Sequence, residues 1–191
     1  AGKILANQLT VFLGDQLRAF RDKEKLILGI CNGFQTLLKA GLIVPPDEDG
    51  PLATLAHNTS GKFEDRWVHL AATPGKCVFL RGYSKIYLPV AHGEGNFLVR
   101  EPWILKGLEQ AGQVVLRYVT ADGEPGEYPA NPNGSQGHVA GLCDASGRVL
   151  GLMPHPERHT LPTHHPQWTR LGLASEGEGL RMFRNAVEYF K

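Results

Sequence analysis

The sequence predicts an α/β fold, in which helices pack on a sheet. The apolar run from Leu26 to Ile30 is typical of a buried strand and is followed at once by apolar residues at helical spacing. More apolar runs of strand length follow, and the chain ends in an amphipathic stretch from Gly179 to Phe190. Strands and helices in this order indicate a sheet that is flanked by helices.

The first part of the chain predicts a helix, a strand, a second helix and a loop. Ile4 to Leu17 has apolar residues at helical spacing, and Leu26 to Ile30 then forms the buried strand. A second helix follows Cys31 and ends at Gly41, because glycine suits the residue just after a helix. Pro45 to Pro51 is rich in turn-forming residues and predicts a loop.

The middle of the chain is rich in predicted strands. Strand-like runs extend over Lys62 to Leu70, Lys76 to Leu80 and Ile86 to Val90. Pro102 to Ala111 predicts a short helix, and Val114 to Val119 predicts a further strand.

The last part of the chain predicts a loop, a hairpin and a helix. Ala121 to Gly134 is dense in Gly, Pro, Asn and Asp, which predicts a long loop. Val139 to Leu142 and Val149 to Met153 predict two strands, and Asp144 to Gly147 between them predicts a hairpin turn. Gly179 to Phe190 predicts the last helix.

The bulk composition indicates one globular domain over residues 1–191. Hydrophobic residues make up 42% of the chain and charged residues 20%, which is ordinary for folded proteins. The formal net charge is +1 and like charges do not form long runs, which argues against binding to nucleic acid or to a membrane surface. Because the sequence lacks a membrane-span pattern and a secretion-signal pattern, we expect a cytoplasmic protein.

Cys31 is the candidate nucleophile. It lies between the predicted strand and helix, with Gly29 and Gly33 two residues to either side, which is the layout of a nucleophile elbow. We expect both glycines to be required, because a Cβ would collide in so tight a turn. The positive end of the helix dipole would lower the pKa of the thiol, and the backbone N–H of Asn32 would face a developing oxyanion.

The other two cysteines, Cys77 and Cys143, have no such setting and are expected in the core. Three cysteines without a close pair fit neither a disulfide framework nor a zinc site. The sequence therefore predicts a free nucleophile and no metal ligands.

His155 is the candidate base, and Glu157 is the candidate partner that orients it. Both follow the apolar run Val149 to Met153, and the prolines around His155 favour extended geometry, which places residues two apart on the same side. His92 and Glu94 have the same spacing without the prolines, so they are the weaker pair. The remaining histidines lack a carboxylate at useful spacing (His57, His69, His138) or lie in a proline-rich loop (His159, His164, His165).

The motifs resemble a known family. The segment Gly29-Ile-Cys31-Asn-Gly33-Phe-Gln35 resembles the elbow of class I glutamine amidotransferases, and the order of Cys31, His155 and Glu157 resembles their catalytic triad. Within that class, four further blocks resemble the glutaminase part of phosphoribosylformylglycinamidine synthases. These blocks are Asn58 to Val68, Ala91 to Phe97, Asn131 to Ser135 and Met153 to Arg158.

The resemblance implies a flavodoxin-like, mainly parallel sheet flanked by helices. The unbroken apolar run of the strand Leu26 to Ile30 predicts that this strand lies near the middle of the sheet and is buried on both faces. The resemblance also implies glutamine hydrolysis through a γ-glutamyl thioester at Cys31. Ammonia would pass to a synthetase subunit or domain, where ATP and Mg would serve the conversion of formylglycinamide ribonucleotide, so this chain itself would hold no cofactor. The implied substrate-binding positions are Gly29, Gly33, Gln35, Glu94, Asn131, Asn133 and Ser135.

The sequence departs from the family pattern at its start. Members begin with strands, a helix and a Gly-Gly loop that supplies a second oxyanion N–H, and these would precede the helix that opens this chain. We therefore expect an amino-terminally incomplete domain that lacks its first strands, with an uncovered sheet edge, low solubility and little activity. Two alternatives stay open: a stand-alone cysteine amidase or peptidase of the same fold, and a non-catalytic docking fragment.

Overall fold

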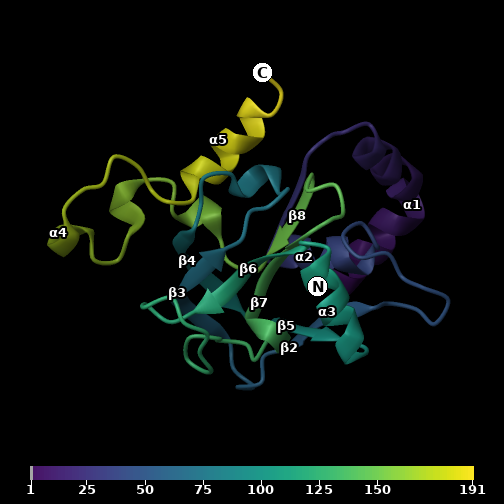
Figure 1. Ribbon diagram of the computed structural model, residues 1–191, viewed down its shortest axis with the longest axis horizontal. Coiled ribbons are helices and arrows are strands. Elements are labelled where there is room, and N and C mark those ends of the chain that lie inside the picture. The colour runs from purple at the N-terminus through teal and green to yellow at the C-terminus, as the bar shows by residue number, and fades with distance from the viewer. Residues whose placement is uncertain (1) are drawn as a thin grey trace.

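A six-stranded mixed sheet organises the chain in the computed structural model, which describes residues 2–191 (Figure 1). The strands lie in the order β1-β8-β7-β6-β3-β4, and a separate two-stranded sheet pairs β2 with β5. The bounds of the strands are β1 Ile27–Ile30, β2 Ala53–His57, β3 Glu64–Ala72, β4 Lys85–His92, β5 Glu94–Val99, β6 Val114–Val119, β7 Val139–Cys143 and β8 Val149–Leu152.

Helices cover both faces of the sheet, so the predicted α/β class is confirmed. The α-helices are α1 Gly2–Asp22, α2 Asn32–Lys39, α3 Pro102–Gln110, α4 Trp168–Leu171 and α5 Leu180–Glu188. Short 3₁₀ helices are η1 Val78–Leu80, η2 Gln136–His138, η3 Pro156–Arg158 and η4 Pro162–His164. Within residues 2–191, no helix combines the length and the hydropathy needed to cross a membrane.

The strand directions correct the expectation of a mainly parallel sheet. Among the described strands, β1 and β8 are the one parallel pair of the large sheet, while each of its other neighbouring pairs is antiparallel. The antiparallel direction of β7 and β8 follows from the short turn between them. Asp144 to Gly147 joins the two strands as a tight hairpin, and a hairpin makes its strands antiparallel. The hairpin was predicted correctly, but the antiparallel pairing that it imposes on the sheet was not.

The position of β1 differs from the middle of the sheet that its apolar run predicted, and agrees with the expected uncovered sheet edge. In the described part of the chain, β1 lies at one edge of the sheet and pairs with β8 alone. Its apolar residues Ile27, Leu28 and Ile30 are half-buried, whereas a strand in the middle of a sheet would be buried on both faces.

Two further differences concern short segments. The apolar run Lys76 to Leu80 was predicted as a strand, but Val78–Leu80 forms η1; its residues are apolar because they fill the core. A short apolar run cannot distinguish a strand from a buried helical turn. The strands β2 and β5 were missed, and β5 contains Gly95 and Asn96, which are poor strand formers.

The core is formed by two apolar clusters on the two faces of the sheet. Alternate residues of β8 show this directly: Leu150 and Leu152 belong to one cluster, and Val149 belongs to the other. α5 covers the first cluster through Met182, and α2 covers the second through Phe34. A strand whose side chains alternate between two apolar layers carries a continuous apolar run, as the sequence has here.

Gly151 permits the contact between β8 and α2. A Cβ at this position would overlap the ring of Phe34 and lie 2.7 Å from Cδ1 of Ile43. We expect Gly151→Ala to lower the free energy of unfolding by about 1–3 kcal/mol, because overpacking a core forces its neighbours apart. A Cβ at Gly107, inside α3, would meet no atom within 4 Å. Gly107→Ala should therefore raise that free energy by about 0.5–1 kcal/mol in urea titrations. Equal effects of the two changes would contradict this packing.

Candidate active site

Cys31 forms the turn between β1 and α2. Its backbone has φ 52° and ψ −106°, a strained conformation for a residue with a side chain, as in a nucleophile elbow. Its N–H donates to the carbonyl oxygen of Leu152 at 2.8 Å, which ties the turn to the end of β8. The predicted elbow is therefore present.

The two flanking glycines have different roles. A Cβ at Gly29 would lie 2.5 Å from Cδ1 of Leu37 and 2.8 Å from the backbone of Gly33, so this glycine lets α2 cross close over β1. A Cβ at Gly33 would meet no atom within 4 Å. The expectation that both glycines are required for steric reasons is correct for Gly29 and wrong for Gly33.

A cavity of about 310 Å³ opens beside Cys31, which is near the lower end of the range for small-molecule sites. Two of the predicted substrate-binding residues lie here: the side-chain amide of Gln35 donates to the backbone oxygen of Glu94 at 2.7 Å. This bond joins the start of α2 to the start of β5. The lining residues are Cys31, Asn32, Gln35, His57, Ala91, His92, Gly93 and Glu94.

His57 lines the cavity although its place in the sequence gave no sign of it. Its Nδ1 lies 3.7 Å from Oε1 of Glu94, because His57 and Glu94 are paired residues of β2 and β5. Spacing along the chain reveals only carboxylates that are close in sequence, and these two residues are far apart. A prediction that β2 pairs with β5 would have indicated that His57 lies beside Glu94.

His155 and Glu157 form the predicted pair. Nδ1 of His155 lies 2.6 Å from Oε1 of Glu157, and His155 is buried whereas Glu157 is half exposed. A carboxylate can only accept, so Nδ1 carries the proton and donates it, and Nε2 is left with its lone pair. Nε2 is buried and has no hydrogen-bond partner among the described residues. The imidazole is thus held in the tautomer that a general base requires.

The parallel pair β1 and β8 brings the nucleophile and the base to the same end of the sheet, beyond the carboxyl ends of both strands. Ile30 is in register with Leu152, so both strands end together and Cys31 and His155 follow them on the same side. The charges of Glu157 and of Arg158 both influence the ionisation of Cys31, which reflects this proximity.

The electrostatics of Cys31 correct the expectation of a lowered pKa. Burial raises the pKa of the thiol above its ordinary value, and this effect exceeds the opposing effects of the Asn32 N–H and of the Arg158 charge. The N–H of Asn32 lowers the pKa of the thiol, although by less than burial raises it. Because the helix start does not ionise the thiol by itself, the chemistry depends on a base.

His92 is less suited to be that base. Asn58 donates its amide to two backbone oxygens, so its Oδ1 accepts from Nδ1 of His92 at 3.2 Å. Burial, helped by the charge of His155, lowers the pKa of His92 to about 4. A group with so low a pKa is a weak proton acceptor at neutral pH, and its partner is a neutral amide in place of a carboxylate. The choice of His155 over His92 is therefore supported.

The loop residues predicted to bind substrate form a buried hydrogen-bond network away from the cavity lining. Asn131, Asn133 and Ser135 are buried and bond to one another: Ser135 N–H donates to Oδ1 of Asn131 at 3.1 Å, and Ser135 Oγ donates to Oδ1 of Asn133 at 2.8 Å. Ser135 Oγ also accepts from the Phe97 N–H at 3.0 Å, and Asn133 donates to the hydroxyl of Tyr118 at 3.1 Å. These three side chains do not line the cavity; they fix the loop against β5 and β6.

The other cysteines lie where the sequence predicted. Cys77 and Cys143 are both fully buried in the core. Across residues 2–191, no group of three or more His, Cys, Asp and Glu side chains is arranged to hold a metal ion.

The buried His92 should make stability depend on pH. Its pKa is about 4 in the folded protein and near 6.5 when unfolded, so the unfolded chain binds a proton first as the pH falls. The stabilisation is complete above pH 6.5 and is lost towards pH 4. Between pH 7 and pH 5 we expect His92 to account for a loss of about 2 kcal/mol of unfolding free energy. Urea titrations at both pH values should show a smaller loss in His92→Asn; an identical loss in both proteins would contradict this.

The comparisons with known proteins agree with this geometry. Residues 1–190 match the family model of the CobB/CobQ-like glutamine amidotransferase domain. The chain is 46% identical over 191 residues to phosphoribosylformylglycinamidine synthase subunit PurQ of Dehalococcoides mccartyi, covering 99% of this chain and 73% of that protein. It is 41% identical over 165 residues to the human phosphoribosylformylglycinamidine synthase, covering 78% of this chain and 12% of that protein.

A solved structure shows the same fold. The match is to PurLQS from Thermotoga maritima, with a TM-score of 0.69, 30% identity, and coverage of 94% of this chain and 68% of the other. The glutaminase domain of Trypanosoma brucei CTPS shares the fold at 12% identity, with a TM-score of 0.51 and coverage of 90% and 64%. The elbow at Cys31, its histidine-glutamate pair and these matches place the chain in the CobB/CobQ-like glutamine amidotransferase domain family.

Proposed function

We propose that this chain is the glutaminase component of phosphoribosylformylglycinamidine synthase and acts in purine biosynthesis. It hydrolyses glutamine and supplies ammonia for the conversion of formylglycinamide ribonucleotide to formylglycinamidine ribonucleotide. The observation that carries the proposal is the 2.6 Å bond between His155 and Glu157, which leaves Nε2 without a partner among the described residues, at the end of the sheet where Cys31 lies. The identity of 46% to a PurQ subunit supports the choice of pathway.

The reaction follows from the protonation states in the site. His155 takes the proton of the Cys31 thiol at Nε2, and the sulfur attacks the side-chain carbonyl of glutamine. Charge that develops on the carbonyl oxygen is stabilised by the N–H of Asn32. The imidazolium, stabilised by Glu157, returns its proton to the leaving nitrogen, and ammonia departs. Water, deprotonated by His155, then cleaves the thioester to give glutamate and the free thiol.

Gln35 and Glu94 are the residues proposed to hold the substrate. Both line the cavity, and their mutual bond fixes one wall of it beside the nucleophile. Gly29 contributes by shape, because its missing side chain sets the distance between β1 and α2. Gly33 leaves open space at its position, which suits a substrate that approaches the start of α2.

The proposed partner is the synthetase of the same enzyme. The solved relative carries the name PurLQS, and the human relative is a far longer protein, of which this chain covers 12%. ATP and Mg belong to the synthetase in this proposal, and this chain needs neither for glutamine hydrolysis. The cytoplasmic location expected from the sequence stays a prediction.

Cys31→Ala provides the direct test of this function. With a synthetase partner present, we expect the variant to lose glutamine-dependent product formation by at least about a thousandfold, because the nucleophile is absent. Ammonia-dependent formation should be unchanged, since the synthetase site needs ammonia alone. Cys77→Ala is the matched control, because Cys77 is buried in the core. The proposal fails if Cys31→Ala still releases glutamate from glutamine, or if Cys77→Ala loses activity equally while remaining folded.

A further inference from the structure

The segment that carries the base is bonded to the outer edge of β4. β4 pairs with β3 on one side, and at Tyr87 and Pro89 its backbone polar groups face the other way. The N–H of His155 donates to the carbonyl oxygen of Pro89 at 2.8 Å. Pro89 lacks an N–H, which is acceptable on an edge strand because no ladder bond is lost. The base therefore has a backbone anchor on β4.

His159 provides a second anchor on the same edge. Its Nδ1 lies 3.0 Å from the carbonyl oxygen of Tyr87, and the side chain is 3% exposed. A carbonyl oxygen only accepts, so Nδ1 of His159 is the donor. Burial lowers the pKa of His159, which favours the neutral ring. Tyr87 and Pro89 are two residues apart, so the two anchors hold successive outward-facing carbonyls of one strand.

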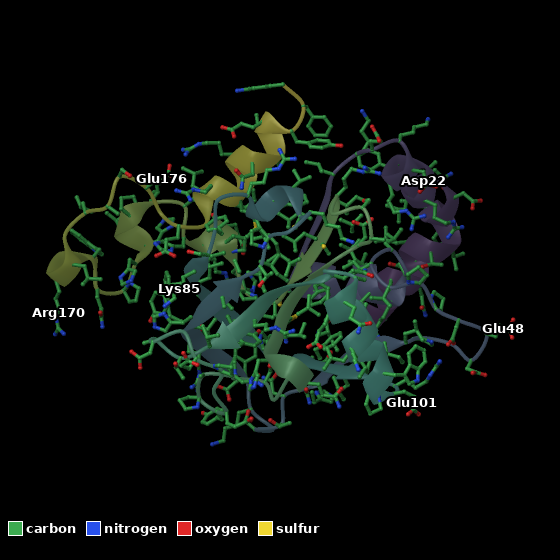
Figure 2. The ribbon with its side chains drawn as sticks, viewed as in Figure 1. Asp22, Glu48, Lys85, Glu101, Arg170 and Glu176 are labelled. Carbon is green, nitrogen blue, oxygen red and sulfur yellow. The ribbon has the colours of Figure 1, made fainter. Side chains whose placement is uncertain are left out.

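The turn η3, with Glu157 at its centre, lies between these anchors. The segment before α5 also packs against this turn; Glu176 of that segment is labelled in Figure 2. Gly179 donates its N–H to the oxygen of His159 at 2.8 Å, and a Cβ at Gly179 would overlap the backbone of Pro156. The carboxylate of Glu178 accepts from the Tyr87 N–H at 2.7 Å.

We infer that His159 is a positioning residue for the catalytic base: its bond to β4 fixes the end of the turn that holds Glu157 against His155. The inference rests on the proposed glutaminase function. Without this bond the carboxyl-terminal end of η3 loses a side-chain anchor on the sheet, and Glu157 can turn the imidazole away from Cys31. Displacements of about 1 Å in a catalytic group lower rates by up to about a hundredfold.

The test compares His159→Ala with His159→Asn. The alanine variant should lower kcat for glutamine hydrolysis by about 10- to 100-fold and leave KM within about twofold, because the substrate contacts lie elsewhere. Asparagine places an N–H close to the position of Nδ1, so His159→Asn should recover most of kcat. His164→Ala, an exposed histidine of the same loop, is the control and should match the parent protein.

Glu178 supplies a second test that does not disturb the core, because its side chain is exposed. Glu178→Ala removes the acceptor for the Tyr87 N–H and should lower kcat by a smaller factor than His159→Ala does. Glu178→Gln keeps an acceptor and should leave kcat unchanged. Wild-type kcat in both alanine variants, or failure of His159→Asn to restore kcat in a folded protein, overturns the inference. Undiminished activity in His155→Ala would overturn the proposed function itself, so the two failures are distinguishable.

Discussion

The parallel pairing of β1 with β8 is the constraint on which the site depends. Both strands end at the same level, so Cys31 after β1 and His155 after β8 meet at the same end of the sheet. The bond from the Cys31 N–H to the Leu152 oxygen, 2.8 Å long, secures that meeting at the strained turn. The rest of the sheet can be antiparallel without affecting the site, since a single parallel pair aligns the two groups.

Burial then determines which residues of the site hold a proton and which can accept one. It raises the pKa of Cys31, so the thiol retains its proton until a base removes it. It also lowers the pKa of His92 to about 4, which leaves that neighbour neutral and unable to compete for the proton. His155 differs because a half-exposed carboxylate, that of Glu157, lies 2.6 Å from its Nδ1 and orients the ring. Two histidines near one nucleophile thus have different roles, set by their partners.

The sequence predicted what short-range patterns control. The elbow at Cys31, the pair His155 and Glu157, and most helices and strands depend on spacing within a few residues. What it missed depends on pairing between distant segments: β2 with β5, and through it the proximity of His57 to Glu94. The positions that the resemblance assigned to substrate binding fall into two groups. Gln35 and Glu94 line the cavity, whereas the residues of the loop Asn131 to Ser135 bond to one another. The pKa of Cys31 was predicted with the wrong sign, since the helix end is visible in the sequence and burial is not.

The central claim is that the pair His155 and Glu157 ionises a thiol which burial otherwise keeps protonated. It is tested most directly by the rate at which iodoacetamide alkylates Cys31 as a function of pH, followed by mass spectrometry of the Cys31 peptide. The account predicts rapid alkylation of the parent protein near pH 7, and in His155→Ala a slow reaction that accelerates only above the ordinary pKa of a thiol, about 8.5. Glu157→Gln should lie between them, because a base remains without its orienting charge. Identical pH profiles for the parent protein and His155→Ala would contradict the account.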